Sequence, residues 1–102
     1  MQIEIFSNDL EKFIQSLEKS TIAKILRTID LLEKFGYDLK LPHSKKITKN
    51  LFELRIRGKQ EIRIFYAFHK SQIVLLHGFV KKSQKTPQKE IQIALDFIKH
   101  LD

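Results

Sequence analysis

The strongest constraint on the fold is the alternating, cation-rich stretch that occupies residues 51–89. Its first segment, Leu51–Arg57, has apolar side chains at every second position, which is the period of a half-buried strand. The segment Gln60–His69 is rich in β-branched and aromatic residues, and the Gly-Lys pair before it fits a tight hairpin turn. The segment Gln72–Val80 is apolar on both faces, as in a strand at the centre of a sheet. The stretch therefore predicts three successive strands.

The alternation also predicts which side chains share a face of the sheet. In the first strand, Glu53 and Arg55 point away from the apolar residues, and in the second strand Arg63 does so. If the hairpin turns at Gly58, then Arg55 and Arg63 come from adjacent strands to the same side. The sequence thus predicts a sheet with one apolar face and one row of cations, and such a row requires an anionic partner.

Helical periodicity precedes the strands. Apolar residues at spacings of three and four predict a helix over Leu10–Leu17 and a longer one over about Thr21–Phe35. Gly36 stands where a helix-ending glycine is expected. A short strand over Gln2–Phe6 could come first. The two helices indicate an αα-hairpin that covers one face of the sheet.

Two further segments complete the predicted fold. Tyr37–Asn50 is expected to be a polar, basic loop, because Pro42 disfavours helix at the residue before it. Thr86 and Pro87 are predicted to be the N-cap and first residue of a final helix. The chain is therefore expected to form a single α+β domain over residues 1–102, with the αα-hairpin packed on a small sheet with an antiparallel core and a C-terminal helix.

Composition excludes several classes of function. The chain has no cysteine, no secretory signal pattern, and no apolar run of the roughly 18 residues that a membrane helix needs. We therefore expect a cytoplasmic protein without a membrane partner. With three glycines and no carboxylate cluster, neither a metal site nor a phosphate-binding glycine loop is expected, and no cofactor is predicted. Residues 40–89 hold 13 Lys or Arg and two acids, so the positive charge is concentrated in one half of the chain.

Three motifs carry a resemblance to a known family. LFELRIRG, IRIFYAF and IVLLHGFVKKSQKTPQKEI occur together and in this order, and they resemble the HigB-like, phage-related branch of the RelE/ParE toxin superfamily. The resemblance implies a RelE-like fold and a type II toxin that acts as a ribosome-dependent, metal-independent endoribonuclease on mRNA. It also implies an antitoxin partner, commonly a helix-turn-helix DNA-binding protein. The family's leading strand is abbreviated here to Gln2–Phe6.

The expected chemistry is attack by the ribose 2′-hydroxyl on the adjacent phosphate. This reaction needs cations around the phosphorane and groups that transfer protons. By their positions in the motifs, the resemblance assigns the stabilisation of transition-state charge to Arg55, Arg63 and Lys82. Glu53 lies on the same face and is a candidate general base. The alternative for Glu53 is a structural ion pair with Arg63 or Arg55 across the hairpin.

The remaining polar candidates are expected to support binding or the core. Tyr66 alternates with apolar residues and is expected to place its hydroxyl in the core, and His77 within LLHGF is expected to be a hydrogen-bonded, buried imidazole. The other basic residues are expected to bind the backbone of ribosomal RNA or the acids of an antitoxin. They are Lys45, Lys46, Lys49, Arg57, Lys59, Lys81, Lys85 and Lys89.

A second hypothesis stays open. The chain could be a basic binding module of the same superfamily that cuts no RNA, either a poison of a DNA enzyme or a cleavage-inactive partner of an antitoxin. Fold alone does not separate these functions. New 5′ ends in translated messages would support the nuclease, whereas growth arrest with intact messages would support the binding module.

Overall fold

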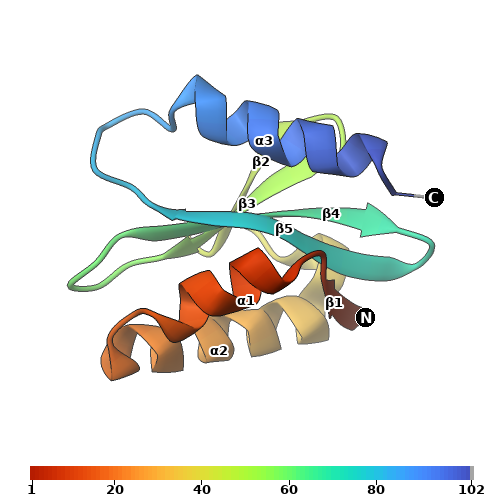
Figure 1. The fold of residues 1–102 in the computed structure, drawn as a ribbon. Coiled ribbons are helices and arrows are strands. Elements are labelled where there is room, and N and C mark those ends of the chain that lie inside the picture. The colour runs from red at the N-terminus through yellow and green to blue at the C-terminus, as the bar shows by residue number, and fades with distance from the viewer. Residues whose placement is uncertain (102) are drawn as a thin grey trace.

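The computed structural model describes residues 1–101 as three α-helices packed on a five-stranded mixed sheet (Figure 1). The strands are β1 (Gln2–Ile5), β2 (Ser44–Thr48), β3 (Leu51–Ile56), β4 (Ile62–His69) and β5 (Gln72–Val80). The helices are α1 (Asn8–Gln15), α2 (Lys19–Phe35) and α3 (Gln88–Lys99), with a 3-10 turn at Gly36–Asp38. The sheet order is β1-β5-β4-β3-β2, and only β1 pairs in parallel. The predicted α+β class is confirmed.

The three central strands and the two N-terminal helices lie where periodicity predicts them. β3, β4 and β5 form an antiparallel core, and Arg55 lies directly opposite Arg63 in its register. Gly36 follows α2 with a φ of +52°, the left-handed backbone that favours glycine at a helix end. The predicted leading strand is confirmed as β1, which pairs with β5 at the edge of the sheet.

The prediction of a loop over Tyr37–Asn50 is wrong in part, because Ser44–Thr48 forms β2. This edge strand buries only Ser44 completely and exposes Lys45 and Lys46, so its sequence lacks the alternation of a half-buried strand. Its pairing with β3 is also irregular between Lys46 and Thr48. Lysines on an edge strand hinder pairing with other chains. Because most of its side chains are exposed, β2 is held in the sheet mainly by its backbone hydrogen bonds to β3.

The predicted start of the last helix is also wrong by one position. Pro87 has extended backbone and occupies the N-cap position of α3, and the helix begins at Gln88. Thr86 does not cap the helix, since its hydroxyl donates a hydrogen bond to Glu53 Oε2 at 2.7 Å. This contact ties the segment before α3 to the middle of β3.

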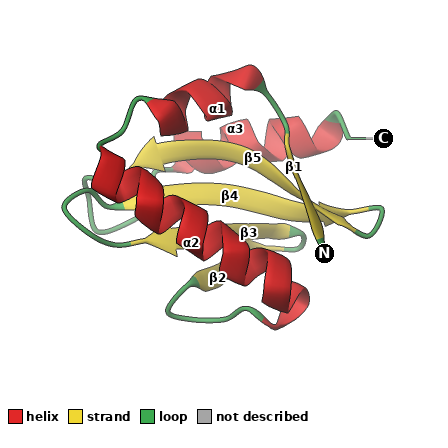
Figure 2. Ribbon diagram, turned by 90° about the horizontal axis from the view of Figure 1, so that it is seen from below, coloured by secondary structure: helices red, strands yellow, loops and turns green. Residues whose placement is uncertain are grey.

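The helices cover both faces of the sheet. Figures 1 and 2 show α1 and α2 on one face and α3 on the other. Under α1 and α2, residues such as Leu54, Ile64 and Leu75 pack against Ile25 of α2. Under α3, a second apolar cluster includes Phe65, Leu76, Phe79 and Ala94. The prediction of one apolar face and one row of cations is wrong in part, because α3 covers the second face with its own apolar stripe and leaves the cations at one end of it.

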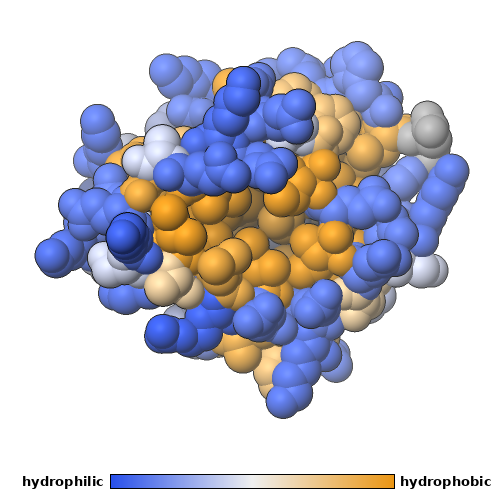
Figure 3. All heavy atoms as spheres, turned by 60° about the horizontal axis from the view of Figure 1, so that its bottom comes forward, coloured by the Kyte–Doolittle hydropathy of each residue, from blue (hydrophilic) through white to orange (hydrophobic). Residues whose placement is uncertain are grey.

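Figure 3 shows the face that carries α1 and α2, where hydrophobic atoms gather in the centre and hydrophilic atoms surround them. Partly buried residues pack against the core there, among them Ile3, Phe13, Leu17 and Ile29. The two helices thus leave part of their shared core open to solvent. Among residues 1–101, no helix combines the length and apolar character needed to cross a membrane.

Candidate nucleic-acid interface

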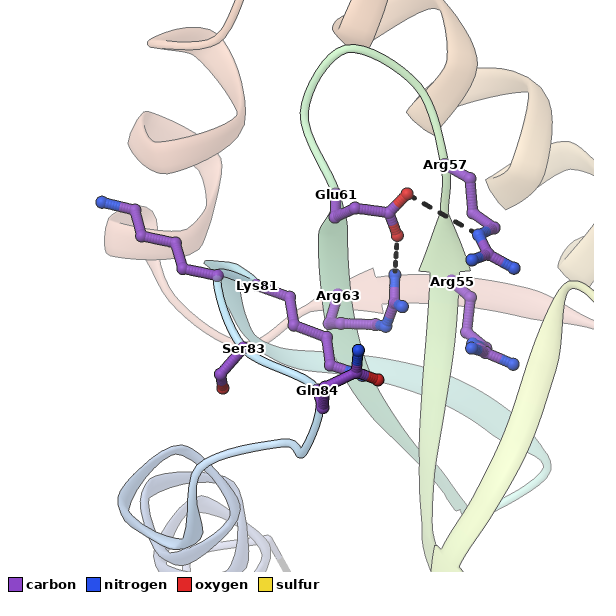
Figure 4. A pocket seen from close by; sticks show the side chains of 8 residues that line it. Arg55, Arg57, Glu61, Arg63, Lys81, Ser83 and Gln84 are labelled. Carbon is purple, nitrogen blue, oxygen red and sulfur yellow. Dashed lines mark hydrogen bonds and ion pairs between the residues drawn. The ribbon is translucent and has the colours of Figure 1, made fainter.

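A cavity at the end of β3, β4 and β5 collects the cations of the central strands; we call it the cationic trough (Figure 4). It has a volume of about 580 Å³. Five cationic side chains and one carboxylate line it, together with two small polar residues. The lining residues are Arg55, Arg57, Glu61, Arg63, Lys81, Lys82, Ser83 and Gln84.

Strand register explains why these cations converge. Arg55 and Arg63 are direct cross-strand neighbours on β3 and β4, as the alternation and the hairpin turn predict. The Lys81 amide donates a hydrogen bond to the carbonyl of Glu61 at 2.7 Å and so extends the pairing of β5 beyond Val80. Like charges directly opposite each other on a sheet are destabilising. Nearby carboxylates would offset this repulsion.

Two glutamates supply that compensation, and both hold Arg63. The Arg63 Nε lies 3.5 Å from Glu53 Oε1, and the two side chains are only 2% and 3% exposed. The Arg63 Nη1 donates hydrogen bonds to Glu61 Oε2 at 3.2 Å and to the carbonyl of Ile62 at 3.1 Å. Glu61 also pairs with Arg57, at 3.6 Å from its Nε. Arg63 is thus a fixed, buried cation at the floor of the trough.

The guanidinium groups keep unused donors. Among residues 1–101, the buried Nε atoms of Arg55 and Arg63 have no partner with hydrogen-bond geometry. Arg55 Nε is 3.9 Å from Glu53 Oε1, beyond hydrogen-bond length. Buried donors without acceptors cost free energy. Both Nε atoms are shielded from solvent beside Glu53, so they belong to the buried cluster around this carboxylate.

Lys81 is the ionisable group of the trough whose protonation is most perturbed by its surroundings. Burial lowers the pKa of Lys81 below its usual value of 10.5, and the charge of Arg63 lowers it further. Figure 4 shows its side chain running toward Arg63 and Arg55. Since a lower pKa increases the fraction of neutral amine near neutral pH, Lys81 can exchange a proton more readily than an exposed lysine.

A β-bulge determines the direction of Lys81. Phe65 pairs with His77 and Tyr66 with Leu75, so one extra residue of β5 lies between these pairs. The extra residue reverses the alternation of the strand. Phe79 consequently joins the cluster under α3, and Lys81 follows it two positions later on the same face. Without the bulge, Lys82 would take that direction.

The other predicted residues are distributed over several surfaces. Lys82 lines the trough, and Lys45 is paired opposite Glu53, which places it on the face that carries α3. Lys46 is paired opposite Phe52 and points to the other face. Lys49 lies in the turn between β2 and β3, at the end of the sheet away from the trough. Three further lysines are exposed. Lys59 follows β3, Lys85 precedes α3, and Lys89 lies in the first turn of α3.

The predicted structural role of Tyr66 is confirmed, and that of His77 is confirmed in part, because its imidazole is hydrogen-bonded but 22% exposed. Tyr66 is buried and its hydroxyl shares a hydrogen bond with Ser44 Oγ, while burial raises the pKa of Tyr66. The His77 Nε2 lies 2.7 Å from Glu90 Oε1 and links β5 to the first turn of α3. The sequence therefore distinguishes Tyr66 and His77 correctly from the residues that line the trough.

Replacing Tyr66 with phenylalanine is expected to lower the free energy of unfolding by about 1–3 kcal/mol, because the buried Ser44 hydroxyl loses its partner. Urea unfolding followed by circular dichroism measures this change. The trough should be unaffected in the folded variant, since Tyr66 does not line it. An unchanged free energy of unfolding would contradict the structural role.

The family model of phage-derived Gp49-like proteins (DUF891) matches residues 12–99. The chain belongs to the Gp49-like family. This family is part of the RelE/ParE-like toxin superfamily, and its members are commonly toxins of toxin–antitoxin systems. No curated protein matches the chain with significant similarity.

The trough of this Gp49-like protein lies entirely within the matched region, which extends from α1 to the end of α3. The resemblance of the sequence motifs is thus confirmed at the level of the superfamily. Sequence reasoning missed the special position of Lys81 and the contact of Thr86 with Glu53. The first depends on a bulge, and the second joins residues 33 positions apart.

Proposed function

We propose that this protein is the toxin of a toxin–antitoxin system and that it cleaves mRNA on the ribosome as an endoribonuclease. The trough carries the proposal: five cations converge on one cavity, and Glu61, the carboxylate that lines it, is already paired with Arg57 and Arg63. The trough therefore keeps a net positive charge, which attracts an external polyanion. The membership of a toxin superfamily supports RNA as that polyanion.

The proposed reaction uses the RNA's own nucleophile. The ribose 2′-hydroxyl gives up its proton to a base and its oxygen attacks the adjacent phosphorus. The bond to the 5′-oxygen of the next nucleotide breaks, and that oxygen takes a proton from water. The products are a 2′,3′-cyclic phosphate and a 5′-hydroxyl. Arg55, Arg57 and Lys82 contact the phosphate oxygens, and buried Arg63 adds charge from below. Cations aimed at the developing phosphorane lower the barrier most where they are fixed before the reaction.

We assign the proton transfer from the 2′-hydroxyl to Lys81, because its lowered pKa and its direction into the trough suit a general base. Glu53 is less suited to this role. Its side chain is 3% exposed. One carboxylate oxygen accepts a hydrogen bond from the Thr86 hydroxyl, and the other faces Arg63. We therefore propose that Glu53 positions Arg63.

The ribosome and an antitoxin complete the proposal. A ribosome that aligns the 2′-oxygen with the phosphorus supplies part of the catalysis, since correct orientation alone lowers the barrier substantially. This fits a site with one proton-transferring lysine and many cations. The antitoxin, a helix-turn-helix DNA-binding protein by resemblance, would neutralise the toxin until it is released.

Induction of the chain in a bacterial host tests this function. The 5′ ends of messages are mapped with and without prior phosphorylation, which reveals 5′-hydroxyl ends. We expect new 5′-hydroxyl ends inside translated regions with the wild type and none with Lys81→Met at equal protein level. Growth arrest with intact messages and a DNA-damage response would contradict the nuclease and support the binding module.

A further inference from the structure

A second cationic groove adjoins the trough at the open edge of β3. Its cations are Lys24 and Arg27 of α2, Arg55 of β3, and Arg57 just after β3; His43, before β2, also lines it. Among residues 1–101, no carboxylate lines this groove. We call it the α2 groove; its volume of about 300 Å³ is at the lower end of the range for small-ligand pockets. It has room for one nucleotide and not for a duplex.

The groove exists because β2 leaves the last two residues of β3 unpaired. β2 pairs with β3 only as far as Leu54. Beyond this point a single backbone bond, from the Arg55 amide to the His43 carbonyl at 2.8 Å, joins the two segments. α2 lies along the opening, where Lys24 Nζ donates to the carbonyl of Arg57 at 3.3 Å. The edge of β3 is therefore left accessible between a helix and a loop.

The chemistry of the groove favours nucleic acid. Within residues 1–101, neither Lys24 nor Arg27 forms an ion pair, so their charges are available to a ligand. The floor is apolar and contains Leu31, Pro42 and Ile56. A positively charged groove that follows the phosphate backbone is a feature of proteins that bind single-stranded nucleic acid.

The groove is continuous with the trough, which indicates that one RNA strand occupies both. Arg55 and Arg57 line both cavities, and Figure 4 shows their guanidinium groups on the other side of β3 from Lys81. We propose that the single-stranded message leaves the trough across Arg55 and Arg57 and that its neighbouring nucleotide occupies the α2 groove, held by Arg27 and Lys24. This inference rests on the proposed function and adds a binding subsite to it.

Salt-dependent binding of 2′-O-methyl oligouridines, which lack the nucleophile, tests the subsite. For a single strand of about 12 nucleotides, Arg27→Ala should reduce the slope of log K against log salt by about 0.7, the value for one lost phosphate contact. The slope for a trinucleotide, which fills only the trough, should not change. Lys12→Ala on α1 removes the same charge from an exposed position and should leave both slopes unchanged.

Other outcomes overturn the proposal in distinguishable ways. Equal slopes for Arg27→Ala and the wild type on the long strand would remove the subsite and leave the trough intact. A loss of affinity confined to ribosomes without message would assign the groove to ribosomal RNA, and a loss confined to poly-glutamate would assign it to an acidic protein segment. If the wild type bound neither oligonucleotide, the proposed function would fail together with the subsite.

Discussion

Replacing Arg63 with alanine is expected to lower the free energy of unfolding by about 3–5 kcal/mol, the typical effect of breaking a buried ion pair. The change leaves Glu53 buried with an uncompensated charge, because that carboxylate is 3% exposed and Arg63 is its nearest cation. Urea unfolding followed by circular dichroism measures the loss. Since small domains are stable by only about 5–15 kcal/mol, this loss is a large share of the total.

The neighbouring arginine provides the matched control. Arg55 is 20% exposed and its Nε is 3.9 Å from the same carboxylate, so Arg55→Ala should cost less than about 1 kcal/mol. Adding Glu53→Gln to Arg63→Ala should restore part of the lost stability, since the two sites are coupled. If Arg63→Ala were no more destabilising than Arg55→Ala, the ion pairs of Arg63 with Glu53 and Glu61 would contribute nothing to stability.

Replacing Lys81 with methionine is expected to reduce the rate of RNA cleavage about 10²–10⁴-fold, the usual contribution of a general acid or base. Methionine keeps an unbranched chain and removes the amine. The wild-type rate should rise with pH and level off below pH 10.5, because burial lowers the pKa of Lys81 and the neutral amine is the base. Single-turnover cleavage measured across pH gives the profile.

Stability distinguishes this chemical role from damage to the fold. Because the folded pKa of Lys81 lies below 10.5, the unfolded chain binds more protons between these two values. The group therefore opposes folding below its folded pKa, and the stability of the wild type rises with pH through that window. Lys81→Met should be at least as stable as the wild type at neutral pH. A variant that retained the wild-type pH profile would exclude Lys81 as the base.

The sequence predicts the meeting of Arg55 and Arg63 because both determinants are local. Strand alternation fixes the face of each side chain, and the turn at Gly58 fixes the register that places them opposite each other. β2 is different, since an edge strand that buries one residue fully has no periodic signature. Its place in the sheet follows from backbone pairing, which single-sequence patterns do not record.

The choice between two adjacent lysines shows the other limit. Alternation counted along β5 without the bulge would place Lys82 on the face that carries α3, and the bulge opposite Phe65 and Tyr66 places Lys81 on that face. A bulge depends on how two strands accommodate each other, so its position is not written in either strand alone. Long-range contacts such as Thr86 with Glu53 likewise appear only when the chain is folded.

Cleavage of a defined message on purified ribosomes tests the role of the trough most directly. A labelled message is bound to ribosomes with its A site vacant, and the fragments made by the wild type and by Lys81→Met are analysed for their end groups. We predict cuts at the A-site codon that carry 2′,3′-cyclic phosphate and 5′-hydroxyl ends, slowed at least about 10²-fold by Lys81→Met. An intact message beside folded, ribosome-bound wild-type protein would contradict the account.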